Sequence, residues 1–194
     1  MSPLGIALRR IADALSRESA AFALIGGLAV SVHTEPRFTR DIDMAVASAN
    51  DAAAEALIRR LVHDGWNVSA IVEQDAVDRL ATVRLDPPAD VGTVAVVDLL
   101  FASSGIEPEV VSAAEPLEVL PDVVVPVAPL AALIVLKALA ASPARPHDEI
   151  DLAALITVAT ADDREHAQRL AALVIERGFH RGRDLIAELD RRFG

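Results

Sequence analysis

The sequence predicts an α+β protein, with a mixed α/β part at residues 1–127 and an all-helical part at residues 128–194. Two observations indicate this division. Short apolar runs typical of strands alternate with helical periodicity as far as the proline-punctuated stretch at 117–128. From Leu130 onward only helical periodicity remains. We therefore expect a sheet-containing domain followed by a C-terminal helical bundle.

The elements of the first part follow from periodicity and from capping residues. A helix with one apolar face is expected at 4–19 and a strand at 22–26, and a short helix begins at the glycines and ends before Pro36. Asn50 or Asp51 caps a further helix that Gly65 closes. The remaining expected elements are strands at 41–47, 66–73, 79–86 and 93–102, a short helix at 106–113, an extended stretch at 117–128, and helices at 130–141, 148–159, 163–178 and 182–193.

Composition excludes several classes of function. The chain has 194 residues, of which 53% are hydrophobic, and no cysteine, so disulfides, thiolate zinc sites and cysteine nucleophiles are excluded. It has neither the apolar core of a signal peptide nor an apolar run of membrane-spanning length, so we expect a cytoplasmic protein with no membrane association. The five histidines show no metal-ligand spacing.

The net charge of −11 argues against nonspecific coating of nucleic acid, which depends on phosphate neutralisation. Seven arginines nevertheless lie between Arg164 and Arg192. They form either a local basic patch or a solvated helix face of mixed charge, and the sequence favours the second interpretation.

The stretch "DIDMAV" places two carboxylates on one face of a strand. Residues i and i+2 of a strand project to the same side, so Asp41 and Asp43 meet, while Ile42 and Met44 face the core. Two adjacent carboxylates repel each other, and a Mg²⁺ ion removes that repulsion because it prefers oxygen ligands. A lone D-x-D pattern is weak evidence, so other features are needed.

Three further features strengthen the metal interpretation. Gly26 and Gly27 lie between a strand and a helix, where backbone N–H groups can approach phosphate oxygens. Asp98 is a carboxylate in a strongly apolar strand; the alternative is a strand-end aspartate that accepts backbone hydrogen bonds. The third feature is a group of polar and basic residues just before the pair, whose side chains can meet triphosphate charge: Arg37, Thr39 and Arg40.

These motifs carry a resemblance to known families. "GG", thirteen residues, "DID" and a later strand aspartate resemble the signature of the DNA polymerase β-like nucleotidyltransferases. The wording R-x-T-x-D-I-D and the helical segment "LKALAASPARPHDEIDLAAL" are closer to the AbiEii-type nucleotidyltransferases, which include the MenT toxins of mycobacterial toxin–antitoxin pairs. The resemblance extends from about residue 22 to residue 155, and it implies a mixed sheet flanked by helices in the first part.

The resemblance implies roles for individual residues. Asp41 and Asp43 would ligate two Mg²⁺ ions, and Asp98 would complete the metal site. Lys137 would reach the nucleotide from the first helix of the bundle; as an alternative, it simply extends its charge from a core helix to water. Asp148 would support the pocket or cap the next helix, with Asp151 as the competing choice. The nucleotide-binding residues that the resemblance implies are Gly26, Gly27 and Lys137. The position before the acidic pair adds Arg37, Thr39 and Arg40.

The function implied is transfer of NMP from an NTP, a pyrimidine nucleotide being favoured, to the 3′ end of tRNA. The protein would be a toxin with a cognate antitoxin protein, and we expect a monomer. The candidate tRNA-facing residues are Arg177, Arg181 and Arg183. Thr39 is a candidate regulatory phosphorylation site, because a phosphate two residues before Asp41 would repel the incoming nucleotide.

Other functions remain open from the sequence. Within the enzyme class, the acceptor is a protein or a small molecule such as an antibiotic. Outside it, the chain is a non-catalytic binding module with a nucleotidyltransferase fold, or an unrelated α/β domain with accidental motifs.

Overall fold

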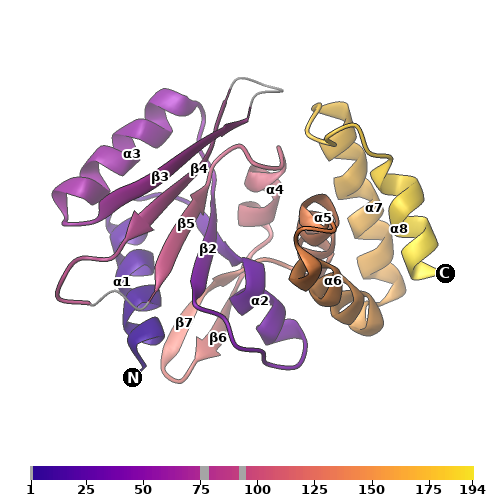
Figure 1. Cartoon of the computed structure of the whole chain (residues 1–194), viewed down its shortest axis with the longest axis horizontal. Helices are drawn as coiled ribbons and strands as arrows, with labels where there is room; N and C mark the ends of the chain where they lie inside the picture. The colour runs from indigo at the N-terminus through magenta and orange to yellow at the C-terminus, as the bar shows by residue number, and fades with distance from the viewer. Residues whose placement is uncertain (1, 75–78, 92–94) are drawn as a thin grey trace.

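The structure, a computed structural model, describes residues 2–74, 79–91 and 95–194 (Figure 1). Residues 93 and 94, the first two of the strand expected at 93–102, lie outside these ranges. The elements up to residue 127 are α1 (Pro3–Arg17), β1 (Phe22–Ile25), α2 (Gly26–His33), β2 (Asp41–Val46), α3 (Asp51–His63), β3 (Asn67–Gln74), β4 (Arg79–Asp86), β5 (Val96–Leu100), α4 (Glu107–Ser112), β6 (Glu115–Leu120) and β7 (Val123–Val127).

After Val127, the secondary-structure elements in the described part of the chain are helices, as the sequence predicts. They are α5 (Leu130–Ala140), α6 (Pro146–Val158), α7 (Ala161–Glu176) and α8 (Leu185–Phe193). The expected extended stretch at 117–128 is a hairpin of β6 and β7 that turns at Asp122, whose φ is 63°. Division of the chain into two domains at residue 127 stays a prediction.

The strands form one mixed seven-stranded sheet in the order β3-β4-β5-β2-β1-β7-β6. β2 runs parallel to β5, and β1 runs parallel to β7, whereas the other neighbours are antiparallel. Figure 1 shows α1 and α3 on one side of the sheet, α2 and α4 on the other, and α5–α8 beyond α2 and α4. The mixed sheet, its flanking helices and the following helical bundle confirm the predicted fold class.

Local signals explain where the helices begin. The Ser2 side chain caps α1 by accepting a hydrogen bond from Gly5 N, and the Asn50 side chain caps α3 in the same way. The helix α7 begins with a capping box formed by Thr160 and Asp163. α6 begins at Pro146, so Asp148 lies inside its first turn and does not cap it, which differs from one of the sequence expectations.

The helix α5 is apolar almost all round and is correspondingly buried, from Ala131 to Leu139. It contacts α2, α6, α7 and α8. Lys137 is therefore a charged side chain in the middle of a core helix, and it needs charged partners there. Within the described residues, no helix is long and apolar enough to cross a bilayer.

Candidate active site

The strand register brings two of the predicted aspartates side by side on neighbouring strands. Asp43 on β2 lies directly opposite Asp98 on the parallel strand β5. Ile42 and Met44 are fully buried, as the alternation along the strand predicts. Asp41 lies two residues before Asp43 on the same face and is exposed. The neighbouring parallel strands therefore place Asp43 beside Asp98, with Asp41 further along β2 on the same face.

The turn from β1 into α2 closes directly over Asp43. Gly26 has a φ of +67°, which favours glycine, and a Cβ atom built on it would lie 1.9 Å from Asp43 Oδ2. The first glycine of the pair is thus required by both backbone conformation and space. The helix α2 begins next to the carboxylate, and its first N–H groups have no partner within the helix itself.

The Asp43 carboxyl is hard to ionise. Burial and the nearby charge of Asp98 raise its pKa to about 7, and the charge of Asp41 adds to the shift. Lys137 and Arg145 oppose this shift but do not cancel it. At neutral pH the Asp43 carboxyl is therefore only partly ionised, and a bound cation would favour its charged form.

Arg84, which sequence reasoning missed, binds Asp98. It lies opposite Asp98 on the antiparallel strand β4 and donates to both carboxylate oxygens, over 2.8 Å from Nε and 2.7 Å from Nη2. These hydrogen bonds raise the pKa of the Arg84 guanidinium. The alternation in "RLATVRLD" places Arg84 on the face of Thr82, but the register to Asp98 is a tertiary property.

Lys137 forms a buried network with both Asp148 and Asp151, the two alternatives for the acidic residue that supports the pocket. Its ammonium lies 2.7 Å from Asp148 Oδ1 and 2.7 Å from Asp151 Oδ2. Arg145 binds the other oxygen of Asp148 at 2.7 Å, and Arg37 binds Asp151 with two hydrogen bonds. Burial opposes ionisation of Asp151, but the hydrogen bonds from Arg37 and Lys137 outweigh it and lower its pKa.

Two adjoining hollows, here called the aspartate cleft, lie between the sheet and the helical part. They measure about 130 Å³ and about 480 Å³. The first extends toward Lys137 and Asp148, and the second toward Arg84 and Asp98. The residues that line both are Asp43, Leu100, Ser103, Arg145 and Arg181. A substrate in this cleft would contact Arg84 of β4, Arg145 just before α6 and Arg181 in the loop before α8, as well as the aspartates.

The residues before β2 lie close to the glycine turn. A Cβ atom built on Gly27 would lie 2.7 Å from Arg37 Nη2 and 3.3 Å from Thr39 Oγ1. Arg40 is exposed, and its guanidinium lies 5.3 Å from the centroid of the Phe38 ring. Arg37 and Thr39 are thus gathered at the turn, whereas Arg40 stacks on its neighbour.

The three candidate tRNA-facing arginines have different surroundings. Arg177 binds Glu109 and the carbonyl of Gly105. Arg183 donates to carbonyls at the C-terminal end of α5, the shortest contact being 2.7 Å to Ala138 O, and also binds Glu188. Arg181 alone of the three lines the aspartate cleft, where burial, with help from Arg145 and Arg183, lowers its pKa.

The aspartates fit a divalent cation in chemistry, but they are not gathered into a finished centre. In the part of the chain that the structure describes, no three acidic or histidine side chains are grouped closely enough to hold an ion. The fit rests on the all-oxygen donor set, on the register of Asp43 with Asp98 and on the raised pKa of Asp43. In this structure, both carboxylate oxygens of Asp98 accept hydrogen bonds from Arg84.

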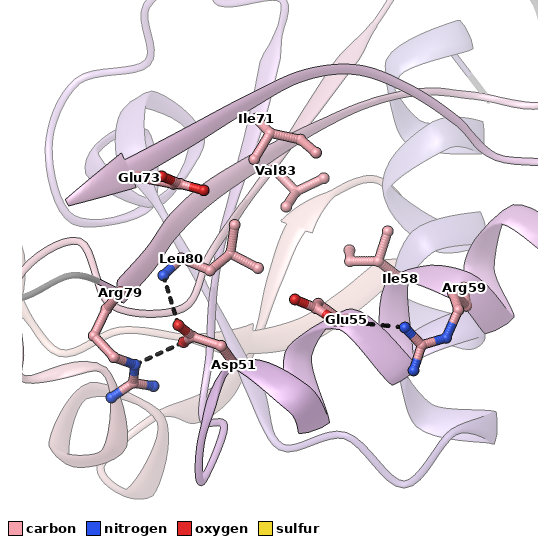
Figure 2. Close-up of a pocket in the computed structure, with 9 residues that line it drawn as sticks. All are labelled: Asp51, Glu55, Ile58, Arg59, Ile71, Glu73, Arg79, Leu80 and Val83. Carbon is pink, nitrogen blue, oxygen red and sulfur yellow. Dashed lines mark hydrogen bonds and ion pairs between the residues drawn. The ribbon is translucent and has the colours of Figure 1, made fainter. Parts of the chain in front are cut away.

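A separate hollow of about 540 Å³ lies on the opposite face of the sheet, between α3 and the β3–β4 hairpin (Figure 2). Val83 lines it, whereas its neighbours Thr82 and Arg84 line the aspartate cleft. Its acidic side chains are largely paired: Asp51 binds Arg79 at 2.6 Å and Glu55 lies 3.5 Å from Arg59. Asp43 and Asp98 lie in register at the aspartate cleft, so we assign the site to that cleft.

Comparisons with known proteins decide the family. The family described as "Nucleotidyl transferase AbiEii toxin, Type IV TA system" matches residues 7–193. The chain belongs to this family. It is therefore a nucleotidyltransferase by family membership, and the family description implies an antitoxin partner. No curated protein matches the chain.

Solved structures share the fold of this AbiEii-family chain. An antigenic nucleotidyltransferase-like protein from Paracoccidioides brasiliensis aligns over 96% of this chain and 92% of its own, with a TM-score of 0.53 and 17% identity. The antibiotic-resistance factor ANT(2'')-Ia aligns over 91% of this chain and 94% of its own, with a TM-score of 0.54 and 19% identity. At these identities the likeness concerns the fold alone.

Proposed function

We propose that the chain is a Mg²⁺-dependent toxin that transfers NMP from an NTP to the 3′ end of tRNA in the cytoplasm. The observation that carries this proposal is the face-to-face register of Asp43 and Asp98 beside the Gly26 turn. A phosphate-binding turn and facing carboxylates at one point suit a nucleotide bound through divalent metal. The family match supports nucleotidyl transfer as the reaction class.

Asp41, Asp43 and Asp98 would hold two Mg²⁺ ions. Bound there, the ions would neutralise triphosphate charge and lower the pKa of the acceptor hydroxyl. Asp98 would orient that hydroxyl or accept its proton, because it lies at the cleft wall opposite Asp43. The acceptor oxygen would form a bond to the α-phosphorus of the NTP, and pyrophosphate would leave.

The triphosphate would bind at the turn between β1 and α2. The N–H groups of Gly26 and Gly27 lie at a helix N-terminus, which favours phosphate. Thr39 and Arg40 would assist from the loop before β2, and Lys137 from α5. Asp148 would hold Lys137 in position, since they are 2.7 Å apart.

The tRNA acceptor is favoured by the cations of the cleft. Arg84, Arg145 and Arg181 all line it, and in the described residues Arg181 has backbone carbonyls as its hydrogen-bond partners and no carboxylate. A polyanion with a terminal hydroxyl suits such a lining. Arg177 and Arg183 would flank the acceptor while bonded to their own chain. The resemblance to MenT toxins favours a pyrimidine nucleotide.

The activity of the toxin would be regulated by phosphorylation of Thr39. Its hydroxyl lies near the glycine turn, so a phosphate on it would add close to two negative charges where the triphosphate binds. The cognate antitoxin, encoded separately, would act through this modification.

The test incubates the protein with each α-labelled NTP, Mg²⁺ and total tRNA, beside protein and antibiotic acceptors. Label on tRNA that is lost in Asp41→Ala would support the proposal and identify the nucleotide. Label on protein or on the antibiotic would instead identify that molecule as the acceptor. No label from any NTP, with the fold intact, would favour a non-catalytic binding module.

A further inference from the structure

The Arg37 guanidinium occupies the space where a side chain at position 27 would begin. A Cβ atom on Gly27 would meet Arg37 Nη2 at 2.7 Å and Arg37 Cζ at 3.2 Å. Unlike Gly26, Gly27 has no left-handed φ, so its backbone conformation does not require glycine. What excludes a larger residue at position 27 is the Arg37 side chain above it.

A buried carboxylate fixes the guanidinium in this position. Asp151 accepts from Arg37 Nε at 2.6 Å and from Nη2 at 2.7 Å, and its side chain is 2% exposed. Asp151 is itself held by Lys137 at 2.7 Å. A planar fork bound along one edge keeps its remaining N–H groups in a defined direction.

Part of the guanidinium remains available to a ligand. Among the described residues, the one hydrogen-bond partner of Nη1 is the carbonyl of Phe38, at a long 3.4 Å. Nη2 has a second hydrogen beyond the one donated to Asp151. These donors lie beside the N-terminus of α2, where backbone N–H groups already favour an anion.

We propose that Arg37 supplies the side-chain phosphate contact of the Gly26–Gly27 turn, and that Gly27 is required because any side chain there displaces Arg37. Asp151 is the positioning residue that holds Arg37 over the turn. This inference rests on the proposed nucleotidyltransferase function. It adds that positions 27, 37 and 151, far apart in sequence, act as one phosphate-binding unit.

The test is a double-mutant cycle on nucleotide affinity, measured by titration calorimetry in the presence of Mg²⁺. Each of the four NTPs is titrated into the wild-type protein, and the tightest is used for Arg37→Ala, Gly27→Ala and the double variant. Gly27→Ala is expected to fold, since alanine favours helix and the displaced atoms are the tip of a long side chain. Arg59→Ala, a change of an exposed arginine on α3, is the matched control.

We expect Arg37→Ala to weaken affinity at least about tenfold, the effect of losing a charged hydrogen bond. Gly27→Ala should weaken it to a similar degree, and the double variant should be no weaker than Arg37→Ala, because both changes remove the same contact. Asp151→Asn should also weaken affinity, and Arg37→Lys should recover part of it. Arg59→Ala should leave affinity unchanged.

Two kinds of result would overturn the inference in distinguishable ways. If the wild-type protein binds an NTP but Gly27→Ala is harmless, or if the two losses add in the double variant, Arg37 does not act through position 27. If the wild-type protein binds none of the four nucleotides, the proposed function itself fails and the inference with it. Melting curves of each variant establish that it is folded.

Discussion

Arg84 donates one hydrogen bond to each carboxylate oxygen of Asp98, at 2.8 Å and 2.7 Å. The two residues face each other on β4 and β5, and on its other side Asp98 faces Asp43. Asp98 thus lies between a guanidinium and a second carboxylate. A divalent cation at this site has to share Asp98 with Arg84 or displace it.

The first prediction follows from this competition. Without bound metal, Arg84→Gln should lower stability by about 1 kcal/mol, because the pair is partly exposed. Mg²⁺ should then raise the melting temperature more than in the wild-type protein, since Asp98 is free to bind it. Arg79→Gln is the matched control, because Arg79 lies on the same strand but pairs with Asp51 outside the cleft. An equal Mg²⁺ effect in all three proteins would contradict competition at Asp98.

The second prediction concerns Asp43 and pH. Its carboxyl keeps a proton up to about pH 7 in the folded protein, against an ordinary pKa of 3.8. The folded state binds this proton more tightly than the unfolded state, so stability is lost as pH rises from about 4 to about 7, and the loss is complete above that. The Asp43→Asn variant lacks this titrating carboxyl, so it should not lose stability in this way as the pH rises.

Without bound metal, Asp43→Asn should therefore be more stable than the wild-type protein at pH 8, by about 1–3 kcal/mol, and equal to it near pH 4. Urea unfolding at several pH values measures the difference. The same variant should have no transferase activity. A stability difference that does not depend on pH would show that the Asp43 carboxyl is not perturbed.

The third prediction separates the two constraints on Gly26. Gly26→Ala adds a Cβ atom 1.9 Å from Asp43 Oδ2 at a residue with φ +67°. We expect a loss of about 2–4 kcal/mol from backbone strain and the clash together. Gly182 has a φ of +71° with nothing within 4 Å, so Gly182→Ala should cost only about 1 kcal/mol. Equal losses from urea unfolding would mean that Asp43 moves aside freely.

The fourth prediction concerns the buried charge in α5. Lys137→Met leaves Asp148 and Asp151 without the ammonium that binds both, and should lower stability by about 3–5 kcal/mol. Arg192→Met breaks the Arg192–Glu149 pair nearer the surface of the same helical part and should cost about 1 kcal/mol or less. Denaturant unfolding of the two variants compares them. Similar small losses would indicate that solvent reaches Lys137.

The fifth prediction tests charge at Thr39. Thr39→Glu should strongly reduce NMP transfer, because a carboxylate there repels the triphosphate, whereas Thr39→Val should reduce it mildly. Initial rates at a fixed NTP concentration compare the two variants. Equal reductions would instead point to a hydrogen bond from the hydroxyl.

The sequence predicted the fold class and the first half of the site because these depend on local patterns. Alternation along "DIDMAV" placed Asp41 and Asp43 on one face, and the loss of strand patterns after Pro129 marked the helical part. The structure agrees on both, with Ile42 and Met44 buried and helices from Leu130 onward.

The sequence could not predict which distant residues come into contact in the folded protein. Arg84 meets Asp98 through strand register, and Arg37 meets Asp151 across 114 positions of sequence. The sequence offered Asp148 and Asp151 as alternatives for the acidic residue that supports the pocket, whereas in the structure both bind Lys137. Periodicity gives the face on which a side chain lies, but not which distant residue comes to face it.

We propose above that Asp41, Asp43 and Asp98 support transfer of a nucleotidyl group. The most direct measurement compares an α-labelled with a γ-labelled NTP, with Mg²⁺ and total tRNA, in the wild-type protein and in Asp43→Asn. We expect that the α-label becomes attached to tRNA, that the γ-label appears only in pyrophosphate, and that Asp43→Asn transfers neither. Label transferred from the γ position, or transfer that persists in folded Asp43→Asn, would contradict it.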